Sequence, residues 1–221
     1  MIRFAALIAA AFLLPAAFAE TAPVPPAAET NPDEAMAAPA PITVRADELG
    51  ALLEGASWVH KGTGRIPFYS VGFRSCPDCL AQKVGAEDAL EAAGADIRYI
   101  VYARPDGEDG KPRSKPGERA MVAELWKSRS WNLYHAWYET DPATYYETEN
   151  LPPSADSDAE RKALVEKSRA FVVTLRDILQ ANGIQLYVPV VFWRSNGNWI
   201  AYVGYNPDTF QQAVLAKLSG A

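Results

Sequence analysis

Cysteine, histidine and positive charge are all scarce in this sequence. Its 221 residues include two cysteines and two histidines, and 21 Lys and Arg stand against 27 Asp and Glu, for a formal net charge of −6. An acidic chain of this kind is a poor match for nucleic acid or for an anionic membrane surface as its main partner. No internal repeat with a fixed period is present either, so the sequence gives no sign of a repeat architecture.

Apart from one stretch near the N-terminus, long apolar runs are absent too. Phe4 to Leu14 is apolar, follows a positive charge at Arg3, and is followed by Pro15 and the small-x-small sequence Ala17-Phe18-Ala19. The run is shorter than the roughly 20 apolar residues that a membrane-spanning helix needs. This layout is typical of a cleavable signal peptide, so we expect residues 1–19 to be removed on export.

The next segment, residues 20–41, is rich in Ala, Pro, Glu and Thr. It offers little apolar surface to offset the entropy cost of ordering, and its prolines favour an extended chain. We predict a disordered tether there. Residues 42–221 are sufficient for one domain with a hydrophobic core.

The two cysteines are three positions apart, in the sequence Cys76-Pro77-Asp78-Cys79. A structural disulfide in an exported protein usually closes a long loop, because the loop-closure entropy grows with the number of enclosed residues. A bridge across two residues gives little stability of this kind. The pair therefore requires a chemical explanation.

The residues around this pair predict a strand, a helix and a second strand, in that order. Residues 68–73 alternate as a strand does, and residues 97–103 predict another strand. Between them Pro77 to Ala93 predicts a helix, with Gly94 suited to the position after its end. Its apolar spacing rests on Leu80, Val84, Leu90 and Ala93. The dithiol is thus expected at the strand-to-helix junction of a βαβ unit.

Residues 105–183 predict a mostly helical insertion. One helix is expected around residues 117–128, and a long one is expected to open at a capping box over residues 157–160. The aromatic residues between them suit either a substrate-binding surface or packing onto the sheet. We favour packing, since large aromatic side chains are mostly buried. They are Trp126, Trp131, Tyr134, Trp137, Tyr138, Tyr145 and Tyr146.

The C-terminal part predicts a hairpin followed by a helix. Strands are expected at residues 187–193 and 199–203, joined by a turn at residues 195–198. Asn206-Pro207 then predicts a helix start, because proline is tolerated in the first turn. Its buried stripe is expected to consist of Phe210, Val214 and Leu218.

The chemistry of the pair follows from its place at a helix N-terminus. Backbone N–H groups there favour the thiolate form of Cys76, which we expect to be the exposed attacking sulfur. Cys79, one turn further in, would be the resolving thiol. Pro77 suits the first turn because its missing N–H is not needed. The carboxylate of Asp78 opposes the thiolate, so we expect a lowered Cys76 pKa, though less lowered than in strongly oxidising proteins.

A metal site or an inert short-range disulfide is the alternative reading of the same pair. Zinc prefers four ligands, and His60 and His135 are the other candidates, neither of them spaced for joint ligation. Two thiolates could also carry Cu(I), but no Met lies near the pair to add a soft ligand. We therefore predict no resident metal or cofactor.

Pro189 is the second informative residue. A proline inside a predicted central strand argues against that strand. It fits if the Val188–Pro189 bond is cis and lies at the start of the strand, beside the dithiol. There the backbone of Val188 would stay available to a substrate chain. Cis bonds are only about 5–6% of X–Pro bonds, but this context favours one.

Taken together, these pieces resemble the thioredoxin superfamily, and most closely the periplasmic disulfide-bond proteins of the DsbC/DsbG type. The resemblance rests on the segments 52–56, 73–79, 182–192, 196–200 and 204–207. It implies an α/β thioredoxin-like fold, with the helical insertion between a βαβ half and a C-terminal ββα half. It also implies a periplasmic thiol–disulfide oxidoreductase with Cys76 as nucleophile, Cys79 as resolving thiol and Pro189 as the cis-proline.

Three departures from that family shape the expectation. Only the tether stands where the isomerases carry a dimerisation domain, so we expect a monomer. Val188 replaces the usual Thr before the cis-proline and is similar to the oxidant branch. Ser70 occupies the place of the buried acid of reductase-like thioredoxins. We expect protein substrates with thiols or disulfides and a separate recycling partner, and the direction of exchange (oxidase, reductase or isomerase) stays open.

Overall fold

The computed structural model describes residues 38–140 and 151–218, all within one compact unit. The expected signal peptide and most of the expected tether lie outside these residues. The tether prediction is wrong at its end, because Ala40 and Pro41 belong to strand β1 (Ala40–Ile42). Ala40 pairs with Ala201 in the antiparallel ladder to β5. Composition could not show this, since the partner strand is far along the chain.

A five-stranded mixed sheet forms the centre of the described unit, in the order β1-β5-β4-β2-β3. Strands β2 and β3 are parallel, and the other neighbouring pairs are antiparallel. Parallel strands need a crossover, and helix α3 (Pro77–Ala92) supplies it. The remaining strands are β2 (Ile66–Gly72), β3 (Ala95–Val101), β4 (Val190–Ser195) and β5 (Asn198–Val203).

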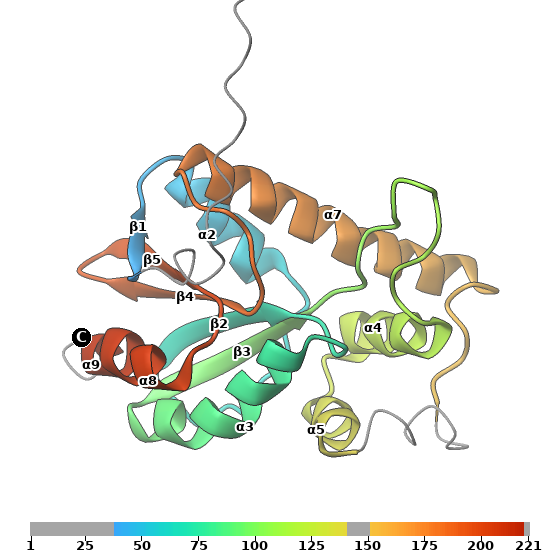
Figure 1. Ribbon diagram of the computed structural model, residues 1–221. Coiled ribbons are helices and arrows are strands. Elements are labelled where there is room, and N and C mark those ends of the chain that lie inside the picture. The colour runs from blue at the N-terminus through green and yellow to red at the C-terminus, as the bar shows by residue number, and fades with distance from the viewer. Residues whose placement is uncertain (1–37, 141–150, 219–221) are drawn as a thin grey trace, which may run out of the picture. The chain divides into compact units, whose positions relative to one another are not determined.

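Helices cover both faces of this sheet (Figure 1). Helix α3 and the C-terminal helices lie on one face, while α2 (Ala46–Gly55) and the long α7 (Ala159–Ala181) lie on the other. The C-terminal stretch runs through α8 (Pro207–Phe210), a π-helical turn η1 (Gln211–Leu215) and α9 (Ala216–Leu218). Its expected apolar stripe is confirmed, because Phe210, Val214 and Leu218 are all buried. No helix in the described ranges is long and apolar enough to cross a membrane.

The predicted helical insertion is present between β3 and β4. It contains α4 (Pro116–Ser128) and α5 (Trp131–Glu139) and ends with α7, which packs against α4. The packing role of its aromatic residues is confirmed for Trp126, Tyr134, Trp137 and Tyr138, which are all buried. Trp126 Nε1 donates to the carbonyl oxygen of Val101 in β3 at 2.7 Å. Trp131 is half-buried, and Tyr145 and Tyr146 lie outside the described residues.

Three local expectations are wrong. Val84 is 76% exposed, because the buried face of α3 instead carries Cys79, Gln82, Lys83, Ala86 and Leu90. Helix α7 is capped by Asp158, whose side chain accepts from Arg161 N at 3.0 Å, rather than by Ser157. Strand β4 begins at Val190, three residues later than expected, because the preceding residues run beside the dithiol without pairing into the sheet.

Candidate active site

Cys76 caps the N-terminus of α3. Strand β2 ends at Gly72, and Pro77 is the first residue of the helix, where its missing N–H costs nothing. Cys76 has extended backbone angles (φ −85°, ψ 117°), and its Sγ accepts a hydrogen bond from the backbone N–H of Cys79 at 3.2 Å. The sulfur therefore takes the role that a Ser or Asp oxygen usually has at a helix start, a position in which the N–H groups of the helix stabilise the thiolate form of Cys76.

Both cysteines are free thiols and both are buried, at 6% exposure for Cys76 and 7% for Cys79. The expectation of an exposed Cys76 is therefore wrong for the residue as a whole. Cys76 does, however, line a cavity of about 580 Å³, together with Pro77, whereas Cys79 is not among the described lining residues. Of the two cysteines, Cys76 is therefore the one that this cavity exposes.

The two thiols differ in acidity. The side-chain hydrogen bond from Cys79 lowers the pKa of Cys76. The backbone N–H groups of Cys79 and Asp78 lower this pKa further, whereas burial and the Asp78 carboxylate raise it. This is the direction expected from the sequence. Burial raises the pKa of Cys79 far above its ordinary value, and the neighbouring Cys76 adds to that rise. Of the two thiols, Cys76 is therefore the one that ionises more readily, and Cys79 the one that keeps its proton.

The carbonyl of Val188 faces the Cys76 thiol, and Pro189 follows Val188 in the chain. The Val188–Pro189 peptide bond is cis. The Cys76 thiol lies 3.5 Å from the carbonyl oxygen of Val188, to which it donates. The carbonyl of Pro189 accepts from Gly204 N at 2.7 Å, which ties the residue to the end of β5. Two segments more than a hundred residues apart thus meet at the sulfur.

Ser70, which stands at the position of the buried acid of reductase-like thioredoxins, makes an uncharged contact. Its Oγ donates to Gln82 Oε1 at 2.8 Å, and both residues are buried. Gln82 Nε2 is buried and has no hydrogen-bond partner among the described residues. The pair is buried and polar, and it carries no charge.

Three buried charged residues around the dithiol were not anticipated. Arg74 donates from Nε to Trp137 O at 3.2 Å and from an NH2 group to Thr140 O at 2.9 Å, at the end of α5. Its guanidinium also lies over the Tyr138 ring, 5.0 Å from the centroid. No local pattern marks Arg74 as buried, because its partners come from the insertion.

Glu118 and Lys83 make the other two connections. Glu118 of α4 accepts from Ser75 N and Ser75 Oγ at 3.4 and 3.2 Å, and is 1% exposed. Lys83 of α3 contacts Glu87 at 3.1 Å and Glu139 of α5 at 3.2 Å. The i,i+4 spacing of Lys83 and Glu87 is visible in the sequence, but the burial of Lys83 is not.

Neither histidine lies in a cluster with the cysteines. His60 contacts Asp96 at 2.9 Å, and His135 lies 3.7 Å from Glu139. Within residues 38–140 and 151–218, no group of three or more His, Cys, Asp or Glu side chains is arranged to hold a metal ion.

Comparisons with known proteins give a match at the level of structure. No family model and no curated protein matches the sequence. The thiol-disulfide exchange protein α-DsbA2 of Wolbachia pipientis matches with a TM-score of 0.50 at 12% identity, over 79% of this chain and 94% of that one. The fold is thioredoxin-like. The expected α/β fold with its helical insertion is therefore confirmed.

Two further solved structures are similar at lower scores. A periplasmic thioredoxin-like protein from Salmonella enterica serovar Typhimurium has a TM-score of 0.46 at 14% identity, over 78% of this chain and 97% of that one. Proteus mirabilis ScsC in a compact conformation has a TM-score of 0.47 at 15% identity, over 82% of each chain. The narrower resemblance to the DsbC/DsbG type stays a prediction.

Proposed function

We propose that this chain is an exported thiol–disulfide oxidoreductase that acts on protein substrates through Cys76 and Cys79. The observation that carries the proposal is the setting of Cys76. Its sulfur caps a helix, has a lowered pKa, lies 3.5 Å from the carbonyl oxygen of Val188, and its side chain lines a cavity. A buried structural thiol would need none of these features. The thiol-disulfide exchange activity of the Wolbachia protein with the same fold supports the proposal.

Exchange proceeds in two steps when the pair is reduced. The Cys76 thiolate attacks one sulfur of a substrate disulfide, forms a mixed disulfide and releases the other substrate sulfur as a thiolate. Cys79 then loses its proton and attacks Cys76 Sγ, which releases the second substrate thiol and leaves a Cys76–Cys79 disulfide. The substrate gains two electrons and the pair loses two. Substrate oxidation is the same sequence in reverse.

The Cys79 proton needs an acceptor in the second step. Ser70 and Gln82 carry no charge and are poorly suited to take it. The substrate thiolate released in the first step is a base of suitable strength and is produced at the same place. We propose that it removes this proton, directly or through water.

A pair of single variants tests the proposal. Cys79→Ser retains the nucleophile but cannot resolve, so it is expected to accumulate mixed disulfides with other exported proteins on non-reducing gels. Cys76→Ser is the matched control and is expected to trap none. If neither variant traps partners and the wild type retains copper or zinc through purification, the oxidoreductase proposal fails.

The direction of exchange is decided by the reduction potential of the pair, measured by equilibration with glutathione. A lowered Cys76 pKa stabilises the reduced form and makes the pair more oxidising. A potential near that of thioredoxin, about −270 mV, would instead identify a reductant supplied with electrons by a partner.

Location and oligomeric state are part of the same proposal. We propose a periplasmic monomer, released by cleavage between Ala19 and Glu20 and recycled by a separate redox partner. N-terminal sequencing of the exported protein tests the cleavage, and an intact Met1 would contradict it. Sedimentation of the processed protein tests the monomer.

A further inference from the structure

The cavity beside Cys76 carries positive charge although the protein is acidic. Arg104, Arg113 and Arg176 line it, and none of its described lining residues is Asp or Glu. The whole chain has a net charge of −6. A concave site lined by charges of one sign raises the local concentration of partners with the opposite sign. The entrance to the nucleophile therefore favours negative groups.

The same cavity has an apolar part. Val173 of α7 and Tyr187 line it, and they are 37% and 39% exposed. In the part of the chain that the structure describes, Val44 and Val84 are the other large apolar residues exposed to a similar or greater degree. Exposed apolar side chains gathered at one opening indicate a surface that binds a partner.

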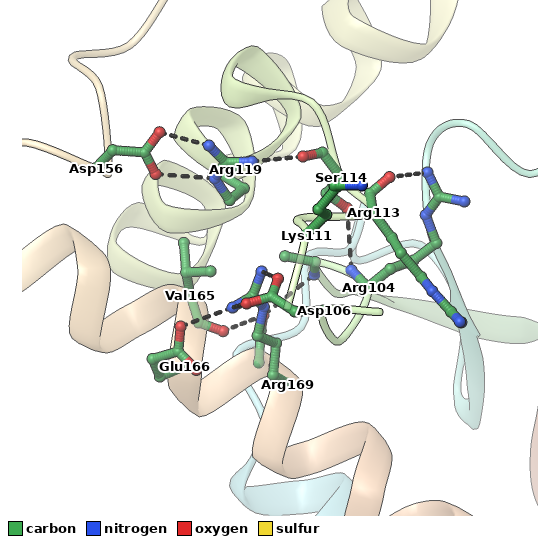
Figure 2. A network of polar contacts seen from close by, with 12 residues as sticks. Arg104, Asp106, Lys111, Arg113, Ser114, Arg119, Asp156, Val165, Glu166 and Arg169 are labelled. Atoms are coloured by element: carbon green, nitrogen blue, oxygen red, sulfur yellow. Dashed lines mark hydrogen bonds and ion pairs between the residues drawn. The ribbon is translucent and has the colours of Figure 1, made fainter. Parts of the chain in front are cut away.

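An acidic residue of the loop that carries Arg104 and Arg113 forms an ion pair with helix α7 (Figure 2). Asp106 pairs with Arg169 of α7 at 2.5 Å, and the backbone N–H of Arg104 donates to Ser114 Oγ at 3.0 Å. The side chains of Arg104 and Arg113 extend away from the pair of Asp106 and Arg169 in Figure 2. These contacts fix the loop in place, so less entropy is lost when the loop binds a partner.

Two carboxylates near the arginines are exposed and easily replaced. Asp177 lies 3.5 Å from Arg176, and both side chains are 50% exposed. The pKa of Asp109 is lowered, chiefly by its hydrogen bond to Lys111 and to a smaller extent by the charge of Arg113. Exposed pairs of this kind contribute little to stability. A carboxylate from a substrate can therefore take their place.

The geometry points to a substrate class: unfolded protein segments that carry an acidic residue and an apolar residue close to the reacting cysteine. The apolar side chain packs against Val173 and Tyr187, and the carboxylate pairs with Arg113 or Arg176. Arg104 is less available, because it lies 4.9 Å from the Phe73 ring centroid and donates to the carbonyl of Arg113. This inference rests on the proposed function.

Three symmetric peptide disulfides test the inference. They share a Phe-Cys core and differ in their flanking residues, which are Glu, Ser or Lys. The reduced protein is mixed with each peptide at low salt, and the rate of peptide thiol release is measured. The Glu peptide is expected to react about 10-fold faster than the Lys peptide, or more, because electrostatic attraction raises association rates. High salt is expected to shrink the ratio.

Arg113→Glu and Lys111→Glu form a matched pair of variants. Both change the charge of the same loop by the same amount, but Lys111 does not line the cavity. Arg113→Glu is expected to abolish most of the preference for the Glu peptide, while Lys111→Glu keeps it. Equal wild-type rates for the Glu and Lys peptides overturn the inference, as does an equal loss of the ratio in both variants.

Two further readouts separate the possible failures. If the reduced wild type reduces none of the three peptide disulfides and the oxidised wild type oxidises none of the peptide thiols, the proposed function itself fails. If it reduces all three peptides equally, only the substrate class is wrong. If Arg113→Glu slows the reaction with glutathione disulfide but alters no peptide rate, the cavity serves a small acidic thiol and the inference is overturned.

Discussion

At the scale of single residues, Asp78 acts on Cys76 in two opposing ways. Its backbone N–H lowers the pKa of Cys76, whereas its carboxylate raises it. Pro77 lacks an N–H and adds no charge, so the side chain at position 78 is the one variable charge between the two cysteines. The acidity of the nucleophile can therefore be tuned at this position without altering the helix start.

Asp78→Asn is expected to lower the pKa of Cys76 further and to make the pair more oxidising. The substitution removes the opposing charge and retains the backbone N–H. A pH titration of thiolate absorbance measures the pKa, and equilibration with glutathione measures the potential. A Cys76 pKa that rises, or a potential that becomes more negative, would contradict the role assigned to the carboxylate.

Gly72→Ala is expected to slow turnover about 10²-fold, the cost of an active-site displacement of roughly 1 Å. A Cβ on Gly72 would lie 2.7 Å from Cys79 Sγ, so the resolving thiol has to move. The mixed disulfide is expected to persist longer than in the wild type, as non-reducing gels would show. Gly55→Ala is the control, since no atom lies within 4 Å of its added Cβ. Equal turnover in the two variants would contradict the close approach of residue 72 to Cys79 Sγ.

At the scale of elements, the helical insertion is tied to the dithiol at three points. Arg74 reaches the end of α5, Ser75 donates to Glu118 of α4, and Lys83 of α3 contacts Glu139 of α5. These links join the loop from β2 to α3, and α3 itself, to the insertion. The insertion therefore acts as part of the scaffold that positions Cys76, in addition to supplying a wall of the cavity.

Arg74→Met is expected to lower the free energy of unfolding by about 2 kcal/mol, because the buried carbonyl of Trp137 and the partly buried carbonyl of Thr140 lose a donor. Denaturation in urea measures this loss. Arg45→Met is the control: the Arg45 side chain bonds the exposed side chain of Glu48 at the surface, so little change is expected there. Similar losses in both variants would show that the Arg74 contacts are not what holds the loop.

At the scale of the whole molecule, protonation of the dithiol is linked to folding. Unfolded cysteine titrates at about pH 8.5. Cys76 has a lower pKa in the native state, so between the two values the native protein binds fewer protons than the unfolded chain and gains stability as the pH rises. The raised pKa of Cys79 acts the other way, and only above about pH 8.5, where the unfolded thiol ionises and the native one does not.

The reduced wild type is therefore expected to gain stability relative to Cys76→Ser as the pH rises toward about 8.5, and to lose that gain as the pH falls through the native pKa of Cys76. Urea denaturation of both proteins under reducing conditions, across this range, measures the difference. A difference that is flat or falls with rising pH would mean that the Cys76 thiolate is not stabilised in the native state.

The structural features that could be predicted from the sequence are those set by residues close together in the chain. A Cys pair between a strand pattern and a helix pattern, and a proline before an apolar strand, are decided by residues close together in the chain. Val84 shows the limit, because apolar spacing placed it on the buried face of α3. Gln82 and Lys83 hold that face instead, since Ser70, Glu87 and Glu139 provide their polar partners. Such partners are not visible until the chain has folded.

The sequence by itself determined the cysteine pair and its place at a helix start, because helix capping and the limits on proline act over a few residues. Only the tertiary structure decided what surrounds them. Folding brings Arg113, Arg176 and Tyr187 to one cavity from three separate segments. It also buries Arg74 and Glu118 beside the dithiol. Burial and charge around the sulfur depend on long-range packing, and this packing sets the chemistry of Cys76.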